Sequence, residues 1–299
     1  MAILNRGFDQ VNLRGSVGAV TYRRVDGVTL ASQKVPMKST ARRTRAVMLQ
    51  RMKWANLVAL WKSLNVRGWH PSFPKETFGV TDFQAFMSAN LKTAGIYIDK
   101  GSQRAGVTIA APAKITEGTL TPIVIEDETN IPLTNIGVGT LNIGGSTTLK
   151  AFSDAVIANN ADWRNGDKLT LITMNNVETD PNAPTVKVDM QQVQLDTSTD
   201  AQTIILGDVI DVAMFTVRDG FLSWVNAVTG AIAAVHSRNN GDGTTSVSRQ
   251  SLVCNNATLI ARYTGNVAFE KASVSYGVFA EEEYLTPIIG TEEATTIVP

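Results

Sequence analysis

Three side chains are the natural candidates for nucleophilic or metal chemistry, because His70, His236 and Cys254 are the only histidines and cysteine in the chain. They are too few for a structural zinc site, and a single cysteine excludes a disulfide framework. His70 precedes Pro71 in an aromatic loop, His236 lies in a predicted strand, and no GxSxG nucleophile motif occurs. We therefore interpret both histidines as packed or hydrogen-bonded structural residues. Cys254 ends a strand-like run and is predicted to be a buried small hydrophobe.

Two clusters carry the oxygen side chains that calcium prefers. They are Asp162, Asn165 and Asp167, and Asn239, Asn240 and Asp242. Neither cluster has the ligand spacing of an EF-hand, and asparagine, aspartate and glycine are also the residues that tight turns require. We predict turns at both places and no metal site.

No glycine-containing segment of the chain has the spacing of a phosphate-binding loop. After Gly137-Val138-Gly139, Asn142 stands where a GxGxxG motif needs its third glycine, and no GxxxxGK[ST] motif occurs. No cofactor is expected, and the chain is predicted not to be an enzyme.

The charges are segregated along the chain, although 27 basic and 27 acidic side chains give a formal net charge of zero. Residues 1–104 carry 17 basic and 5 acidic side chains, a net charge of +12. Residues 105–299 carry 10 basic and 22 acidic side chains, a net charge of −12. Such asymmetry indicates head-to-tail contacts between copies, or a basic segment held near nucleic acid, or simply two solvated halves. The sequence leaves these three alternatives open.

Eight basic residues of the N-terminal part are the candidate contacts to acidic neighbours. They are Arg14, Arg23, Arg24, Arg42, Arg43, Arg45, Arg51 and Lys53. Their candidate complement is the acidic run Glu281, Glu282 and Glu283. Three of the arginines crowd the first turn of a predicted helix, where the helix dipole disfavours cations. An acidic surface nearby would relieve that repulsion.

A β-hairpin is predicted over residues 13–35. Its two β-branched runs are joined by Asp26-Gly27, a dipeptide that tolerates the positive φ of a type I′ turn. Gly15 and Gly18 are expected to let the first strand bend or approach another backbone closely.

Two helices follow the hairpin. The first begins at a cap formed by Ser39 or Thr40 and continues without glycine or proline, with Trp54 and Trp61 seven residues apart on one face. That spacing is typical of core or interface packing. The second helix starts at a capping box over residues 81–84 and ends near residue 94.

The rest of the chain favours short antiparallel strands. From a boundary within residues 100–115, period-2 segments separated by turns predict one or two Ig-like β-sandwich modules, split near residues 200–215. A helical turn is expected within residues 152–163, and no segment after residue 95 has a helical pattern comparable to that of the two helices above. The predicted fold class is α+β, mainly β, with a basic region over 1–104 and an acidic β-sandwich region over 105–299.

Composition agrees with a folded protein, since 43% of the residues are hydrophobic and 18% are charged. That is enough apolar material for a sizeable core. No run approaches the 18 or so apolar residues of a membrane span, and the first ten residues lack the apolar run of a secretory signal. We expect a soluble, intracellularly made protein.

Both ends of the chain carry a distinctive order of residues. The N-terminal part has the run from Leu13 to Val20, the short hairpin, and the helix start from Met48 to Lys53. The other end has Ser237-Arg238, the glycines at 241 and 243, and the serine-rich strand over 246–248. In these features the chain resembles a family of unknown function found in Bacteroidota genomes and their phages. The resemblance implies an α/β N-terminal region attached to β-sandwich domains, encoded among virion genes of crAss-like tailed phages.

The function expected from this resemblance is structural. We expect a virion protein of a tailed bacteriophage, made in the host cytoplasm, and most specifically a neck or tail ring subunit (connector) beneath the portal. Its partners would be copies of itself in a ring, with twelvefold symmetry as one option, together with the portal and other neck or tail proteins, and no membrane. One alternative is a capsid-decorating or glycan-binding adhesion protein, which would need Trp163 or Trp224 as an exposed platform. Another is a DNA-contacting core protein, although nucleic acid is not expected as the main partner.

Overall fold

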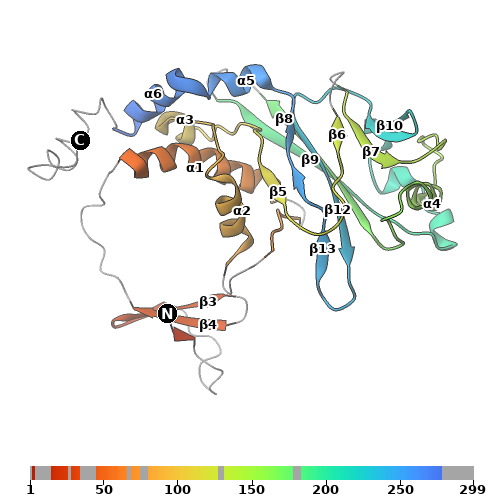
Figure 1. The fold of residues 1–299 in the computed structure, drawn as a ribbon, viewed down its shortest axis with the longest axis horizontal. Helices are drawn as coiled ribbons and strands as arrows, with labels where there is room; N and C mark the ends of the chain where they lie inside the picture. The colour runs from red at the N-terminus through yellow and green to blue at the C-terminus, as the bar shows by residue number, and fades with distance from the viewer. Residues whose placement is uncertain are drawn as a thin grey trace, which may run out of the picture.

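The computed structural model describes most of the chain. The described residues are 2–3, 15–25, 28–33, 45–65, 69–74, 80–126, 131–177 and 183–277. Six α-helices and several antiparallel sheets lie within these ranges, and strands predominate after residue 110 (Figure 1). The prediction of an α+β, mainly β fold is confirmed.

Four short strands near the N-terminus form one antiparallel sheet in the order β1-β4-β3-β2. They are β1 (Ala2–Ile3), β2 (Gly15–Val17), β3 (Val20–Val25) and β4 (Val28–Gln33). Val25 pairs with Val28, so residues 26–27 join β3 to β4 as a two-residue hairpin loop requires. The dipeptide Asp26-Gly27 itself lies outside the described residues.

The expectation of one bent strand before that loop is wrong. Gly18 has a φ of +57°, and Val17 pairs with Val20 across a second turn. A φ in this left-handed region suits glycine because glycine has no Cβ. Gly18 therefore reverses the chain and separates β2 from β3.

Helices α1 (Arg45–Leu64) and α2 (Asp82–Asn90) match the two predicted helices. The expected cap of α1 at Ser39 or Thr40 lies outside the described residues. The capping box of α2 is present: the Thr81 hydroxyl accepts from the Gln84 backbone N–H at 3.3 Å, and the Gln84 side chain accepts from the Thr81 N–H at 3.0 Å.

The longest strands form a central antiparallel sheet in the order β13-β12-β8-β9, with β15 also paired to β12. They are β8 (Lys168–Val177), β9 (Thr185–Gln194), β12 (Gly230–Asn239), β13 (Thr245–Val247) and β15 (Val253–Cys254). Strand β8 is buried on both faces: Leu169 and Leu171 belong to one hydrophobic core, and Ile172 and Met174 belong to another. A buried, nearly continuous apolar strand is the expected consequence.

Gly230 starts β12 where two backbones meet. A Cβ at this position would lie 1.9 Å from the carbonyl oxygen of Met174, so only glycine fits the β12–β8 pairing there.

A second sheet, in the order β10-β11-β7-β6, lies beside the central one (Figure 1). Its strands are β6 (Ile125–Glu126), β7 (Leu133–Gly137), β10 (Phe215–Arg218) and β11 (Phe221–Trp224). A smaller pair joins β5 (Lys114–Thr116) to β14 (Gln250–Ser251), and three 3₁₀ turns lie at Asp200–Gln202, Leu206–Asp208 and Val212–Met214. The largest core contains Ile136 of β7, Trp224 of β11 and Leu169 of β8, so it joins the two sheets.

Helix α4 (Leu149–Asn159) covers that core and accounts for the helical turn predicted within 152–163. It is longer than expected because Thr148 caps it, accepting a hydrogen bond from the Ala151 N–H, and because Phe152 and Val156 are fully buried on one face.

Three further helices occur that the sequence pattern did not indicate. Helices α3 (Lys100–Arg104), α5 (Ala257–Arg262) and α6 (Gly265–Ser275) also occur. The spacing of hydrophobic residues did not indicate α6, because this helix is rich in alanine, serine and valine and has a weak apolar stripe. Its helical state comes from packing against α1, where the Ser273 hydroxyl lies 3.7 Å from the Met52 sulfur.

Helix α1 also packs on the central sheet. Leu60 and Leu64 of α1 lie in the same core as Ile172 of β8 and Val235 of β12. This shared core holds the long helix against strands that follow it by more than 100 residues in the sequence.

Candidate functional site

The predicted assembly contacts fall into described and undescribed parts of the chain. Arg14, Arg42, Arg43, Glu281, Glu282 and Glu283 lie outside the described residues. Arg23 and Arg24 lie on β3, and Arg45, Arg51 and Lys53 lie on α1. Arg23 and Arg51 are exposed, and Lys53 is half-buried. The structure thus groups these residues on two elements, the N-terminal sheet and α1.

The N-terminal sheet, β1 to β4, pairs with no other described strand. In Figure 1 it lies apart from the helices and from the central sheet. Among the side chains of this sheet whose burial is described, Thr29 and Leu30 of β4 are buried, and a hydrogen bond of 3.0 Å joins the hydroxyls of Ser16 and Thr21 on β2 and β3. A sheet of such short strands buries little apolar surface by itself.

Helix α1 presents its two tryptophans to α2. The ring of Trp61 packs edge-on against Phe83 with 5.5 Å between the ring centres, and Trp54 meets the same ring at 6.1 Å. Trp61 also contacts Phe86, while Trp54 keeps 41% of its surface exposed. The helix face that carries Trp54 and Trp61 therefore packs against α2, and Trp54 remains partly exposed to solvent.

His70 lies beside this face, and its Nδ1 is 3.8 Å from Asp82 Oδ2. Its ring lies 6.2 Å from that of Trp61, and its Nδ1 lies 3.0 Å from the Pro71 carbonyl oxygen.

A buried polar cluster is built around Asp167, which precedes β8. Its Oδ2 lies 2.8 Å from His236 Nε2 and accepts from Arg238 Nη2 at 2.7 Å, and its Oδ1 accepts from Arg238 Nε at 2.8 Å. The backbone N–H of Arg164 adds a further hydrogen bond at 2.9 Å. The Asp167 side chain is only 2% exposed, so this fork–fork pairing lies inside the fold.

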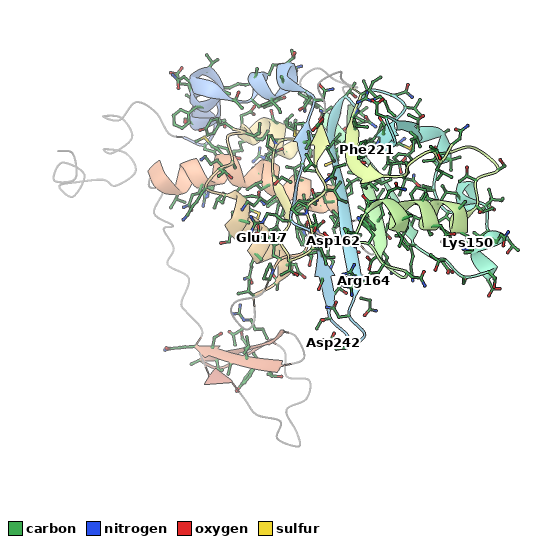
Figure 2. All side chains as sticks on the ribbon, turned by 45° about the vertical axis from the view of Figure 1, so that its right-hand side comes forward. Glu117, Lys150, Asp162, Arg164, Phe221 and Asp242 are labelled. Atoms are coloured by element: carbon green, nitrogen blue, oxygen red, sulfur yellow. The ribbon has the colours of Figure 1, made fainter. Side chains whose placement is uncertain are left out.

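The fold places these groups through one turn and one strand. His236 and Arg238 are two residues apart on β12 and therefore point to the same face. Asp167 follows a tight turn in which Gly166 has a φ of +87°. Figure 2 shows Asp162 and Arg164 of the same loop beside β12, and Arg238 Nη2 also donates to the Asp162 carbonyl.

The electrostatics of the cluster follow from burial and pairing. Burial by itself would raise the pKa of Asp167, but the hydrogen bonds from Arg238 and His236 outweigh it and hold that pKa below its usual range. Burial dominates at His236 and lowers its pKa, although Asp167 opposes the shift. The pairing with Asp167 raises the pKa of Arg238. The aspartate is thus ionised and the histidine neutral at pH 7.

This arrangement suits structural stabilisation better than acid–base chemistry. Trp163 stacks on His236 with 3.9 Å between ring centres and 10° between planes, and it covers the imidazole. His236 Nδ1 is buried and has no hydrogen-bond partner among the described residues. The interpretation of His236 as a packed, hydrogen-bonded residue is confirmed.

A small cavity of about 170 Å³ opens beside Trp163. Its polar side chains are engaged within the protein: Asp162 accepts from the Thr121 hydroxyl, and Asn160 exchanges two hydrogen bonds with the Gly137 backbone. Trp163 is 8% exposed, and Trp224 is 2% exposed with its Nε1 donating to the Thr173 hydroxyl. Neither tryptophan offers the exposed platform that the glycan-binding alternative requires.

The two clusters of aspartate and asparagine, within residues 162–167 and 239–242, form turns, as predicted. Asp167 is paired with His236 and Arg238. Asp242 accepts from the Thr244 N–H at 2.8 Å at the tip of the β12–β13 hairpin (Figure 2). Gly241 and Gly243 in that tip have positive φ. Within the described ranges, no three histidine, cysteine, aspartate or glutamate side chains are placed to hold a metal ion.

Cys254 is partly buried on β15, and burial raises the pKa of its thiol to about 12. It is therefore a neutral packing residue at pH 7, as its sequence context predicts.

None of the described helices is long and apolar enough to cross a membrane. The chain matches no protein-family model, no curated protein and no solved structure.

Proposed function

We propose that this chain is a structural subunit that assembles with copies of itself in the virion of a tailed bacteriophage, as a ring subunit of the neck or tail. Its task is to hold neighbours together, and it carries out no catalytic step. The proposal keeps the function implied by the sequence resemblance and gives the N-terminal sheet the role of the contact.

One observation carries the proposal. The β1–β4 sheet pairs with no other described strand and lies apart from the helices and the central sheet. Short strands with little buried apolar surface gain stability when another surface covers them. Exposed Arg23 on β3 gives the sheet a positive charge that suits an acidic surface such as the C-terminal half of a neighbouring copy.

The opposite charges of the two halves support the same arrangement. A head-to-tail contact between the N-terminal part of one copy and the acidic part of the next repeats around a closed ring. In the polar clusters described above, Asp167 and Asn160 are engaged within the same chain, which agrees with a structural role.

The test compares charge reversal on the sheet with the same change on the body. We expect Arg23→Glu to weaken self-association of the full-length chain, whereas Lys187→Glu, on the exposed edge strand β9, leaves it unchanged. Mass by light scattering after size exclusion, together with negative-stain images at low and moderate salt, provides the readout. A third variant, Arg42→Glu with Arg43→Glu and Arg45→Glu, examines the charges that precede and open α1.

Rings that form equally well in the wild type, the Arg23→Glu variant and the triple variant would show that neither the β1–β4 sheet nor the basic residues at the start of α1 form the contact between copies. A wild-type chain that remains monomeric at every salt and protein concentration, alone and with a portal protein, would refute the assembly role itself.

A further inference from the structure

Strand β9 forms one edge of the central sheet, and its outer side pairs with no other described strand. It pairs with β8 along all 10 of its residues without a change of register. At the opposite edge the outermost strands are short, since β13 has 3 residues and β15 has 2. The central sheet therefore has one long edge whose backbone groups are able to pair with a further strand.

The backbone groups that face outward from β9 are identified by a hydrogen bond beside the strand. The Leu195 N–H donates to the Asp167 carbonyl at 2.8 Å, in register with the β8–β9 pairing. Because an antiparallel pair alternates, the odd-numbered residues of β9 face β8 and the even-numbered residues face away from it. Within the described ranges, the outward N–H and C=O groups make no hydrogen bond. They belong to Val186, Val188, Met190, Gln192 and Gln194.

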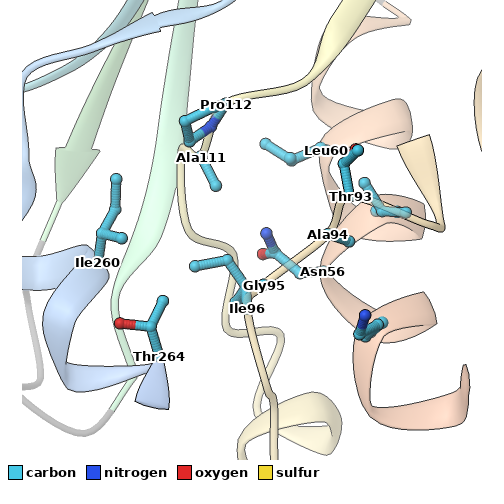
Figure 3. A pocket seen from close by; sticks show the side chains of 12 residues that line it. Asn56, Leu60, Thr93, Ala94, Gly95, Ile96, Ala111, Pro112, Ile260 and Thr264 are labelled. Carbon is cyan, nitrogen blue, oxygen red and sulfur yellow. The ribbon is translucent and has the colours of Figure 1, made fainter. Parts of the chain in front are cut away.

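One loop segment lies against the start of this edge. The Thr108 N–H donates to the Pro184 carbonyl at 3.0 Å, one residue before β9. The segment then crosses to β8, where the Ala110 N–H donates to Asn176 Oδ1 at 3.4 Å. Its next residues, 111–112, face α1 across an apolar cavity of about 230 Å³ (Figure 3). The hydrogen bonds of this segment therefore involve the edge at residue 184, before its first outward-facing residue.

The outward-facing residues of β9 lack the features by which proteins protect a free edge. Such edges are usually blocked by proline, by a bulge or by charged side chains. The five outward-facing residues are two valines, a methionine and two glutamines, and the register contains no bulge. The charged residues of the strand, Lys187 and Asp189, are odd-numbered, so their backbone groups face β8 and their side chains lie on the other face of the sheet.

We propose that this edge pairs with β9 of a second copy, antiparallel across a twofold axis at Met190. An extended strand carries N–H and C=O groups at the spacing of this row. The twofold axis places residue 188 opposite residue 192 and residue 186 opposite residue 194, so each outward-facing residue meets another one. The inference goes beyond the proposed function and does not depend on it, because this contact lies on the body and joins identical surfaces.

The side chains of the two copies are compatible in this register. Asp189 would lie opposite Gln191 of the second copy, and Gln191 Nε2 already donates to Asp189 Oδ1 within one chain, at 2.8 Å. Lys187 would lie opposite Val193, about 13 Å along the strand from Asp189 of the second copy. That distance exceeds the Debye length of about 8 Å at physiological salt, so Lys187→Glu should leave this contact unchanged.

Proline at an outward-facing position tests the pairing in the full-length chain. Gln192→Pro removes an N–H that faces away from β8, so β8 loses no hydrogen bond. Across the twofold axis the dimer loses two hydrogen bonds, and its dissociation constant should rise about thirtyfold, equivalent to ~2 kcal/mol. Gln192→Ala is the matched control, because it removes the same side chain and keeps the N–H. Sedimentation equilibrium in about 1 M salt measures the dimer, since contacts between exposed charges are screened there.

Disulfide formation in mixtures of two variants tests the register. Chains with Val188→Cys should form disulfides with chains carrying Gln192→Cys, because facing residues have Cα atoms about 5.5 Å apart. In the matched control, Gln194→Cys replaces Val188→Cys and would lie about 20 Å from residue 192 of the second copy. Native Cys254 does not interfere, since burial raises its pKa to about 12.

A wild-type chain that stays monomeric in high salt over a wide concentration range would overturn the proposal. So would a Gln192→Pro variant that dimerises as tightly as Gln192→Ala. Equal disulfide yields in the two mixtures would also overturn it, and this result decides the matter if circular dichroism shows that Gln192→Pro is unfolded. A failure of the assembly role is read separately, because Arg23→Glu acts on the head-to-tail contact at low salt and should leave the high-salt dimer intact.

Discussion

The buried cluster at Asp167 and the N-terminal sheet use charge in opposite ways. In the cluster, Arg238 and His236 are matched to one carboxylate that is 2% exposed, and Trp163 covers the imidazole. In the sheet, Arg23 is exposed on strands that, among the described strands, pair with one another. The carboxylate of the first region is paired within the chain, whereas the charge of the second region faces outward.

The difference separates stability from association. Substitutions in the body should change the free energy of unfolding, and substitutions in the sheet should change self-association. Each prediction below can break or sharpen that separation.

The largest effect is expected from Asp167→Ala. It leaves the Arg238 guanidinium without its carboxylate in a largely buried site, and breaking a buried ion pair in this way costs about 3–5 kcal/mol. Urea unfolding monitored by tryptophan fluorescence measures it. Asp154→Ala, which removes the exposed partner of Lys150 on α4, is the matched control and should cost less than ~1 kcal/mol. Similar losses for both variants would show that the Asp167 cluster is not a stabilising element.

Gly230→Ala should follow, with a loss of about 1–3 kcal/mol. The added Cβ would meet the Met174 carbonyl at 1.9 Å, so β12 must shift relative to β8. Gly144→Ala is the control, because a Cβ there meets nothing within 4 Å and the residue has no positive φ. Thermal unfolding of the two variants measures the difference. A Gly230→Ala protein as stable as the wild type would contradict the close β12–β8 approach.

Acid should destabilise the body through His236 before it does so through Asp167. The folded pKa of His236 is lowered, so the unfolded chain binds its proton first and stability falls as the pH drops below about 6.5. The folded pKa of Asp167 is also lowered, so its contribution is lost only at lower pH, below the unfolded value of 3.8 and through the folded pKa. A single such proton changes stability by at most ~1.4 kcal/mol per pH unit.

Urea unfolding between pH 7.5 and 5 measures the histidine effect. His236→Gln should flatten the pH dependence in that range, because glutamine does not titrate. An unchanged slope in the variant would assign the acid sensitivity to other groups.

Local patterns predicted the elements of this fold better than its contacts. The two-residue loop between Val25 and Val28 and the Thr81 capping box depend on neighbouring residues, and both were predictable. Helix α6 was missed because its state depends on packing against α1 rather than on its own apolar pattern. The Asp167 cluster was also missed: β12 periodicity places His236 and Arg238 on one face, but their carboxylate comes from a turn about 70 residues earlier. Spacing along the chain carries no signal for such a contact.

The smallest effect on the body is expected from Leu30→Ala in β4, although Leu30 is 3% exposed. In a single cooperative core this change would cost about 2–5 kcal/mol. If the sheet is stabilised by a neighbour and not by the body, the main unfolding transition of the dilute chain should move by less than ~0.5 kcal/mol. Self-association should weaken in the same variant, because the sheet loses its principal buried side chain. Calorimetry at two protein concentrations, with light scattering on the same samples, separates these effects. A main transition lowered by the full 2–5 kcal/mol would place the sheet within the folding unit of the body and remove the distinction between the two regions.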